Sequence, residues 1–304
     1  MLIETPDQYD PERLRDFDRP APAAACLVAP PAHFQVFDEQ NPHMAGRAGT
    51  VDASRAAAEW NGLVDALRDL QLEVHALGPK EGLPDLCFTA NPSLAGLGPD
   101  GRPFAVLGHM GHASRSGEPA EHGAWYRLRG VRVVDPWGVN AAGESLVWEG
   151  GGDALWHPDR FFLWAGHGQR SNAETHRRLS VALDVPVALL RLVDPAFYHL
   201  DTCLAVLDHR TALWVPGAFD ATAQALLRRA FERLIEVEPA EARSRLAANA
   251  YCPNRREVLL PAGAPRTRRL LEDAGFVVHE VVLDEFSKSG GSVYCLKQEL
   301  PEGF

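Results

Sequence analysis

Five times along this chain a helical pattern is followed by a short strand-like segment, and this recurrence constrains the fold more than any other feature. The clearest helical pattern starts after Asp52, a residue type that caps helices, and keeps apolar residues at a 3.6-residue spacing to about Leu70. Later helices are predicted after Asn172, after Asp220 over residues 221–234, and from Pro265. The strand-like segments begin about 50 residues apart, near Val74, Arg132, Pro186, Ile235 and Phe276.

Further apolar segments between these units predict additional short strands, and the chain therefore belongs to the α/β class. These segments are ACLVAP, FAVLG, FFLWAG, LAVLD, ALWVP and EVLLP. Five units are too few for an eight-unit barrel, and no GxGxxG follows the first strand, as a dinucleotide-binding fold requires. A ring of five small αβ units with loops converging on its axis fits the pattern. We expect residues 1–23 to form an irregular N-terminal extension.

The net charge of the chain limits the kinds of molecule that it is expected to bind. With 30 Lys and Arg against 41 Asp and Glu, the net charge of −11 disfavours nucleic acid and suits a small cation. No apolar run approaches the roughly 18 residues of a membrane span. The charged start of the chain is unlike a secretion signal, and five cysteines without a CxxC pair do not suggest a disulfide framework. We therefore expect a cytoplasmic protein with free thiols.

Polar residues cluster in the loops near the ends of the predicted strands. In a ring of αβ units, loops at matching positions meet at one centre, and loops on a rigid scaffold often carry functional side chains. The polar residues of these loops are Asp85, Asn91, Glu149, Asp153, His199, Asp201, Asn249 and Cys295. The sequence thus predicts one shared site.

Cys295 is the candidate nucleophile of this site. It follows the segment SGGS, whose glycines let the backbone approach a ligand closely. A cysteine nucleophile needs its thiolate, and the imidazole of His199 can stabilise it or shuttle protons. Asp201 would share a strand face with His199 and could orient its ring. Each residue alone also fits a structural interpretation, as a buried thiol or a satisfied core histidine.

Each of the remaining charged candidates, taken alone, fits either a functional or a purely structural position. Glu149 precedes three glycines, and it fits either a solvated turn or a buried carboxylate that faces a cationic substrate. Arg115 and Arg170 offer the planar fork that grips a carboxylate, but either one also fits a surface position. His109 and His112 have metal-ligand spacing, yet no HExxH motif or Cys/His quartet accompanies them, so we expect no metal.

In combination, these motifs resemble those of the guanidino-group modifying enzymes, a superfamily of arginine deiminases, dimethylarginine dimethylaminohydrolases, arginine dihydrolases and amidinotransferases. The resemblance covers roughly Cys26 to Leu300, nearly the whole chain. It rests on NPHM at 41–44, LPDLCFTAN at 83–91, EGGGDAL at 149–155, the arginine of GQRSN, YHLDT at 198–202 and GGSVYC at 290–295.

The resemblance implies a five-bladed α/β propeller with pseudo-fivefold symmetry, formed by residues 1–304 as one catalytic domain. It implies Cys295 as the nucleophile, His199 as the general acid and base, and Glu149 as the carboxylate that holds the guanidinium. Asp201 would assist at the same centre. The implied substrate-binding residues are Asp85 for the α-amino group, Arg115 and Arg170 for the α-carboxylate, and Asn41, Phe88 and Asn91.

Two positions depart from the deiminase pattern. Deiminases and dimethylargininases carry an aspartate where this chain has Asn91, and an amide cannot supply that negative charge. FTAN and the upstream Asn41 are instead similar to arginine dihydrolases, which convert arginine to ornithine, carbon dioxide and two ammonia molecules. EGGGD also has three residues between its carboxylates where deiminases have two, which leaves the register of Glu149 open.

The predicted function is hydrolysis of the guanidino group of arginine or an N-substituted arginine through a covalent S-thiouronium intermediate, without metal or organic cofactor. An amidinotransferase stays an alternative, because an amine could intercept the same intermediate. A non-catalytic propeller module is the third interpretation, and the presence of Cys295, His199 and Glu149 disfavours it. The expected partner is a small cationic guanidino substrate, with no nucleic acid or membrane, in a homodimeric protein.

Overall fold

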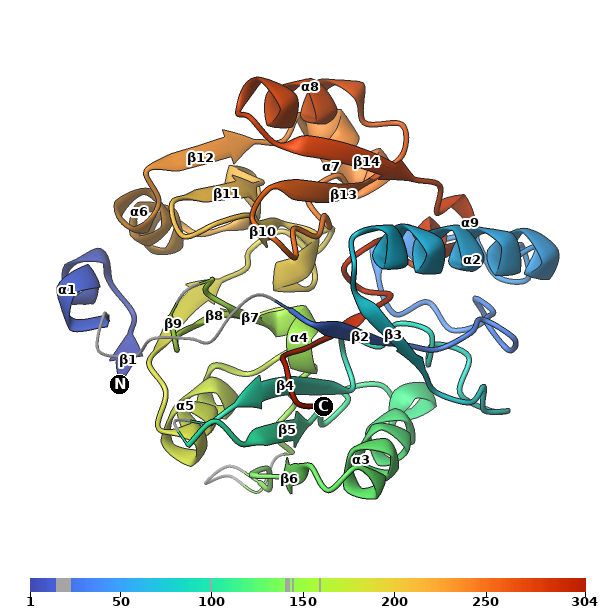
Figure 1. Ribbon diagram of the computed structural model, residues 1–304, viewed down its shortest axis with the longest axis horizontal. Coiled ribbons are helices and arrows are strands. Elements are labelled where there is room, and N and C mark those ends of the chain that lie inside the picture. Colours follow the sequence, from blue (N-terminus) through green and yellow to red (C-terminus); the bar gives the residue numbers. More distant parts are fainter. Residues whose placement is uncertain (15–22, 99, 140–142, 144, 159) are drawn as a thin grey trace.

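The computed structural model describes residues 1–14, 23–98, 100–139, 143, 145–158 and 160–304. Strands in these residues form five separate small sheets, which lie around the middle of the molecule (Figure 1). Helices join strands within the sheets, so the chain has the mixed α/β architecture that the alternating pattern predicts.

Three sheets share one construction, in which two antiparallel strands are followed by a helix and then by a strand parallel to the middle one. The first contains β4 (Ser93–Leu97), β5 (Pro103–Leu107), α3 (Glu118–Leu128) and β6 (Arg132–Val134). The second contains β7 (Ala154–Trp156), β8 (Leu163–His167), α5 (Ala173–Leu183) and β9 (Val187–Arg191). The third contains β10 (Leu204–Val206), β11 (Thr211–Trp214), α6 (Ala221–Ala230) and β12 (Arg233–Glu236).

The other two sheets are each built on a parallel pair joined through a helix. One contains β13 (Glu257–Pro261), α8 (Pro265–Asp273) and β14 (Val277–Val281). The other contains β2 (Ala25–Val28), α2 (Ala53–Asp69), β3 (Glu73–Ala76) and the antiparallel strand β15 (Gln298–Leu300). This last sheet brings residues from near both ends of the sequence side by side (Figure 1).

Short elements complete the described chain and carry several functional side chains. The short strand is β1 (Leu2–Ile3), and the short α-helices are α1 (Pro11–Leu14), α4 (Gly150–Asp153), α7 (Pro239–Arg245) and α9 (Asp284–Ser287). The 3₁₀-helices are η1 (Pro6–Gln8), η2 (Pro42–Met44), η3 (Ala113–Arg115), η4 (Leu200–Thr202) and η5 (Pro216–Ala218).

The helix and strand periodicities are confirmed where they are strongest. Asp52 caps α2, because its Oδ1 accepts hydrogen bonds from the backbone N–H groups of Ser54 and Arg55. Asp220 caps α6 in the same way, through the N–H of Ala223. All six short strands predicted between the units are present, as β2, β5, β8, β10, β11 and β13.

Two helix boundaries differ from the sequence-based expectation. The helix after Asp220 ends at Ala230 and not at residue 234, because the following residues pair with β11 as the start of β12. Asn172 does precede α5, but its side chain does not cap the helix. Its Oδ1 instead accepts a hydrogen bond of 2.7 Å from the backbone N–H of Val147, which ties the helix start to a distant loop.

The prediction of an irregular extension over residues 1–23 is wrong for the part that the structure describes. β1 pairs in parallel with β9, and α1 follows it. Ile3 and Leu14 are fully buried in the largest apolar cluster, so hydrophobic burial holds this segment against the molecule. Residues 15–22 of the predicted extension lie outside the described residues.

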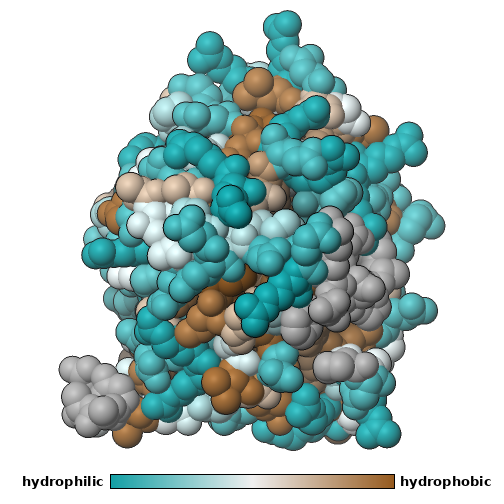
Figure 2. All heavy atoms as spheres, turned by 90° about the vertical axis from the view of Figure 1, so that its left-hand side faces the viewer, coloured by the Kyte–Doolittle hydropathy of each residue, from teal (hydrophilic) through white to brown (hydrophobic). Residues whose placement is uncertain are grey.

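Apolar side chains fill the space between and within the sheets. The largest cluster includes Phe162, Trp164 and Trp214, and a second one packs α2 against Phe88 and Cys295. Hydrophilic residues cover most of the face that carries α1 and α6 (Figure 2). Among the described helices, none combines the length and the apolar composition needed to cross a bilayer.

Candidate active site

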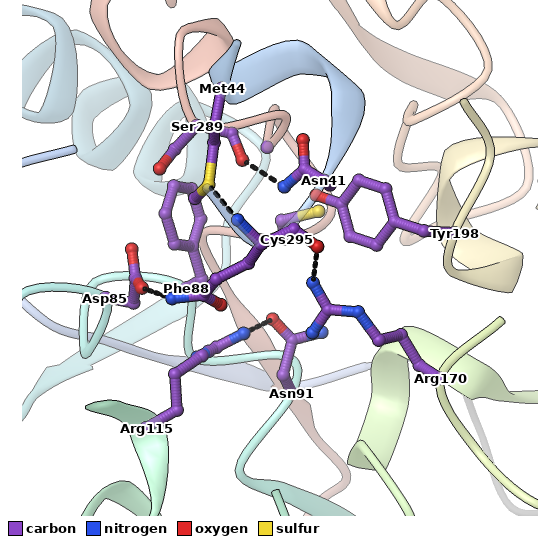
Figure 3. A pocket seen from close by; sticks show the side chains of 12 residues that line it. Asn41, Met44, Asp85, Phe88, Asn91, Arg115, Arg170, Tyr198, Ser289 and Cys295 are labelled. Carbon is purple, nitrogen blue, oxygen red and sulfur yellow. Dashed lines mark hydrogen bonds between the residues drawn. The ribbon is translucent and has the colours of Figure 1, made fainter. Parts of the chain in front are cut away.

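Loops from different sheets meet around one small pocket, as the ring pattern predicts (Figure 3). Seven predicted site residues line it: Asn41, Asp85, Phe88, Asn91, Arg115, Arg170 and Cys295. The other lining residues are Gln40, Met44, Tyr198, Ser289 and Gly291. Three further predicted residues, Glu149, His199 and Asp201, are buried behind the pocket, and each contacts one of the lining side chains.

Cys295 occupies a turn three residues before β15, and its side chain is buried. Its Sγ lies 3.1 Å from Oδ2 of Asp201 and accepts a hydrogen bond of 3.2 Å from Nδ2 of Asn249. Oδ1 of Asn249 also accepts from the backbone N–H of Cys295 at 3.3 Å. Burial, reinforced by the nearby Asp201 carboxylate, raises the pKa of the Cys295 thiol well above its ordinary value. The thiol is therefore protonated here and donates to Asp201.

Asp201 does not share a strand face with His199, contrary to the sequence-based expectation. The two residues lie at the start of the 3₁₀-helix η4, whose tighter turn sends their side chains to different partners. Asp201 faces Cys295, whereas His199 faces Glu149. Burial raises the pKa of Asp201 to about 7, so this carboxyl can exchange a proton near neutral pH.

Glu149 connects the imidazole of His199 to a guanidinium. Its Oε2 lies 2.6 Å from Nε2 of His199 and 3.0 Å from Nη1 of Arg170. Burial raises the pKa of Glu149, but Arg170 and His199 outweigh burial and hold the pKa well below its usual range. Arg170 also donates to the backbone carbonyl of Gln40 and lies over the ring of Tyr198. Glu149 is thus an ionised carboxylate that already holds one guanidinium.

Close packing leaves little room for side chains after Glu149, most strictly at Gly150. Gly150 has a φ of +51°, and a Cβ there would lie 2.4 Å from the carbonyl oxygen of Asn91. A Cβ on Gly151 would lie 3.1 Å from the carbonyl oxygen of Ala90. The glycines form α4 against this loop, and the backbone N–H of Glu149 donates to Ser171. The register of Glu149 in EGGGD, open in the sequence, therefore directs its side chain toward His199.

Asn91 lies between two predicted site residues. Its Oδ1 accepts a hydrogen bond of 3.1 Å from Nη1 of Arg115, and its Nδ2 lies 3.4 Å from Nδ1 of His199. Arg115 is not a surface arginine, because only 4% of it is exposed. Its Nε and Nη2 donate to Glu118 at distances from 2.7 to 3.1 Å.

The opposite wall of the pocket carries further polar groups. Oδ2 of Asp85 accepts a hydrogen bond from Gln40, and burial raises the pKa of Asp85. Asn41 donates to the carbonyl of Ser289 and links the segment before η2 to the glycine loop. The ring of Phe88 packs against Gly291, where a Cβ would approach within 2.2 Å of the ring.

Sequence reasoning left three residues of the site without a role. Asn249 bonds both Cys295 and the carbonyl of Asp201, although the sequence shows it only as one polar residue in a loop. Asp153 accepts hydrogen bonds from Ser171 Oγ and the N–H of Leu200, which fixes the turn before η4. The sequence shows Glu118 only as an acidic residue in the first turn of a helix. Many exposed carboxylates occupy that position, so nothing in the sequence marks it as part of the site.

Comparisons with known proteins identify relatives of this chain. No protein-family model matches the chain. It is 36% identical over 273 residues to N(G),N(G)-dimethylarginine dimethylaminohydrolase of Mycobacterium tuberculosis, covering 90% of this chain and 84% of the relative. It is 35% identical over 281 residues to the bifunctional arginine dihydrolase/ornithine cyclodeaminase AgrE of Nostoc sp., covering 91% of this chain. The matched part spans only 38% of AgrE.

A solved structure shares the fold. The N-terminal domain of ArgZ, in an asparagine-to-serine variant covalently bound to a reaction intermediate, superposes with a TM-score of 0.82 at 33% identity. The alignment covers 90% of this chain and 97% of that domain. Fold and pocket together define an α/β protein of the class that includes ArgZ. The chain belongs to the guanidino-group modifying enzymes, the superfamily of arginine dihydrolases and dimethylarginine dimethylaminohydrolases.

Proposed function

We propose that this chain is a cysteine-dependent hydrolase of the guanidino group of arginine. The observation that carries the proposal is the guanidinium of Arg170, which rests on Glu149 beside His199, next to the pocket that Cys295 lines. A site that holds this group through an ionised carboxylate and an aromatic ring has the chemistry to hold a second one from a substrate. Relatives named arginine dihydrolase and dimethylarginine dimethylaminohydrolase support the same substrate class.

In the proposed complex, the substrate guanidinium takes the place of Arg170 on Glu149. Arg170 then turns to the α-carboxylate, together with the two N–H groups of Arg115 that Glu118 and Asn91 do not use. Asp85 receives the α-amino group, while Asn41 and Phe88 shape the wall around the side chain. These contacts hold the planar guanidinium in one orientation for attack.

The first chemical step joins the Cys295 sulfur to the guanidino carbon. The thiol proton passes to Asp201, 3.1 Å away, and the bond from carbon to one nitrogen breaks. Neutral His199 takes up this proton and delivers it to the departing nitrogen, which leaves as ammonia, so a thiol and a guanidinium become an S-thiouronium and ammonia. In the second step His199 takes a proton from water, whose oxygen adds to the carbon. The sulfur then leaves and recovers the remaining water proton as the thiol, which releases citrulline.

We further propose that hydrolysis proceeds beyond citrulline. Asn91 supplies hydrogen bonds without a second negative charge, a feature that this chain shares in sequence with arginine dihydrolases. A second hydrolysis would convert arginine and two waters to ornithine, carbon dioxide and two ammonia molecules. Incubation with arginine, followed by quantification of citrulline, ornithine and ammonia, tests this. Ornithine with about two ammonia per arginine supports it, and citrulline as the end product contradicts it.

The matched control for this assay is Cys295→Ser, which keeps the size of the side chain and removes the nucleophile. It should lose turnover while the folded structure, followed by circular dichroism, is retained. Methylated arginines and an arginine assay with glycine as an added amine complete the experiment. Failure to convert any of these compounds contradicts the proposed function, and amidinated glycine as the product would establish the amidinotransferase instead.

We propose that the five sheets are the blades of an α/β propeller with pseudo-fivefold symmetry and that residues 1–304 form one catalytic domain. The repeated construction of three sheets and their arrangement around one pocket support this. We also propose a cytoplasmic homodimer. The free state of all five cysteines suits a reducing compartment. Light scattering of the purified chain tests the dimer.

A further inference from the structure

The amide of Asn91 has one orientation that satisfies its neighbours. A guanidinium can only donate hydrogen bonds, so the atom 3.1 Å from Nη1 of Arg115 has to be the acceptor Oδ1. The NH₂ group of Asn91 therefore faces Nδ1 of His199, at 3.4 Å. With the amide turned over, its NH₂ would meet the guanidinium, donor against donor.

The orientation of this amide determines where His199 carries its proton. An NH₂ group needs an acceptor, so Nδ1 of His199 presents its lone pair. The other ring nitrogen, Nε2, lies 2.6 Å from the ionised carboxylate of Glu149 and therefore carries the hydrogen. Asn91 and Glu149 thus select one of the two neutral tautomers from opposite sides of the ring.

Glu118 holds Arg115 in place for this task. Its two carboxylate oxygens accept three hydrogen bonds from Nε and Nη2 of Arg115, the shortest of 2.7 Å. Glu118 is fully buried, and it lies at the start of α3, which fixes its backbone. A bidentate pair of this kind keeps the guanidinium from rotating, so Nη1 stays aimed at Asn91.

Gly152 leaves the space that this contact needs. A Cβ at this position would lie 2.2 Å from Nδ2 of Asn91 and 3.3 Å from Nδ1 of His199. The missing side chain of Gly152, the last glycine of EGGGD, therefore leaves room for the amide of Asn91 to contact the imidazole of His199. This close approach is independent of the Arg115–Glu118 pair and points to the same contact.

We propose that Arg115 and Glu118 are positioning residues that lock the Asn91 amide, so that Nδ1 of His199 is unprotonated before substrate binds. The inference rests on the proposed function in giving His199 a proton to transfer, while the tautomer itself is a property of the free protein.

Nitrogen-15 NMR of ring-labelled protein tests the proposal directly, with His199→Gln identifying the His199 signals. The parent chain should show an unprotonated Nδ1 and a protonated Nε2. Glu118→Gln and Gly152→Ala should each move the Nδ1 signal toward the protonated position. For arginine they should lower kcat by about 10- to 100-fold, by analogy with groups that orient metal-binding histidines, with a smaller change in KM.

Two control variants distinguish a loss of positioning of Asn91 from a general loss of stability. Gly151→Ala places the same methyl group one residue earlier, near the carbonyl of Ala90 and not near Asn91. Glu241→Gln alters another buried carboxylate, which accepts hydrogen bonds from Thr267 in a distant part of the fold. Both should keep the parent tautomer, even where they lower stability.

A protonated Nδ1 in the parent chain would overturn the proposal. The same holds if Gly152→Ala and Glu118→Gln both fold and leave the tautomer unchanged; if Glu118→Gln does not fold, Gly152→Ala alone decides. The outcome is distinguishable from failure of the proposed function. A parent chain that shows the predicted tautomer but converts no guanidino compound contradicts the proposed hydrolase function. It still supports the proposal that Arg115 and Glu118 fix the amide of Asn91.

Discussion

Nη1 of Arg170 and Nε2 of His199 lie 3.0 Å and 2.6 Å from the same oxygen of Glu149. One carboxylate thus serves both an imidazole and an internal guanidinium. Since the proposed substrate also presents a guanidinium to Glu149, Arg170 competes with it in the free protein. The same side chain becomes a partner of the substrate once it has moved to the α-carboxylate.

Arg170→Gln separates these two roles of Arg170. The KM for arginine should rise about 30-fold, because a charge-assisted contact to the α-carboxylate of about 2 kcal/mol is lost. Inhibition by guanidinium ion, which has no carboxylate, should become stronger, because Glu149 is no longer occupied. Steady-state kinetics with arginine and competition by guanidinium measure both effects. Weaker inhibition by guanidinium would contradict the competition.

Asp201→Asn should make Cys295 more reactive toward a thiol-directed reagent. The Asp201 carboxylate raises the pKa of the thiol, after burial, so its removal lowers that pKa and increases the thiolate fraction. Iodoacetamide labelling, mapped by mass spectrometry, should therefore be faster in the variant.

The other thiols of the chain provide the internal reference for this labelling. Cys26 and Cys87 are buried, and burial raises the pKa of Cys26 to about 12. They should stay unlabelled in both proteins. An unchanged rate at Cys295 would show that the Asp201 carboxylate does not control its thiol.

The raised pKa of Asp201 also predicts a pH dependence of stability. Its pKa is about 7 in the folded chain against an ordinary 3.8, so the folded state prefers the protonated carboxyl. The cost of ionising Asp201 therefore grows as pH rises from about 4 to about 7 and is constant above that. Urea unfolding should show Asp201→Asn gaining about 2.5 kcal/mol relative to the parent between pH 5 and pH 8. A constant difference would contradict this pKa.

Gly150→Ala should be strongly destabilising. The backbone of Gly150 has a φ of +51°, which costs an alanine about 1–2 kcal/mol, and the new Cβ would lie within 2.5 Å of two carbonyl oxygens. We expect a loss of about 3 kcal/mol or more in the free energy of unfolding. Gly217→Ala is the control, because a Cβ there meets nothing within 4 Å. Equal stability of the two variants would contradict the packing of α4.

Periodicity and capping were sufficient to predict the longer helices and the strands of the sheets, but not the short helices at the site. Asp52 and the apolar face of α2 are local patterns, and local patterns determine helices and strands well. The convergence of Asn91 and Cys295 at one pocket also followed from the repeated units. Motif resemblance, and not geometry, supplied their proposed roles.

What the sequence did not predict depends on distances between residues far apart in the chain. Asn249 bonds Cys295 across 46 positions, and no periodic pattern encodes such a contact. Alternation placed Asp201 beside His199, but the 3₁₀ turn of η4 redirects it to Cys295. Glu118 and Arg115 have the spacing of an exposed helix pair, and only the packing of α3 buries them.

The pairing of β15 with β2 has a consequence for synthesis of the chain. The strand that completes the sheet of residues 25–28 is translated some 270 residues after them. Cys295 lies shortly before that strand, so the thiol, Asn249 and Asp201 meet only once the ribosome has reached it. Until then, the nascent chain holds β2 without its antiparallel partner and without the contacts around Cys295.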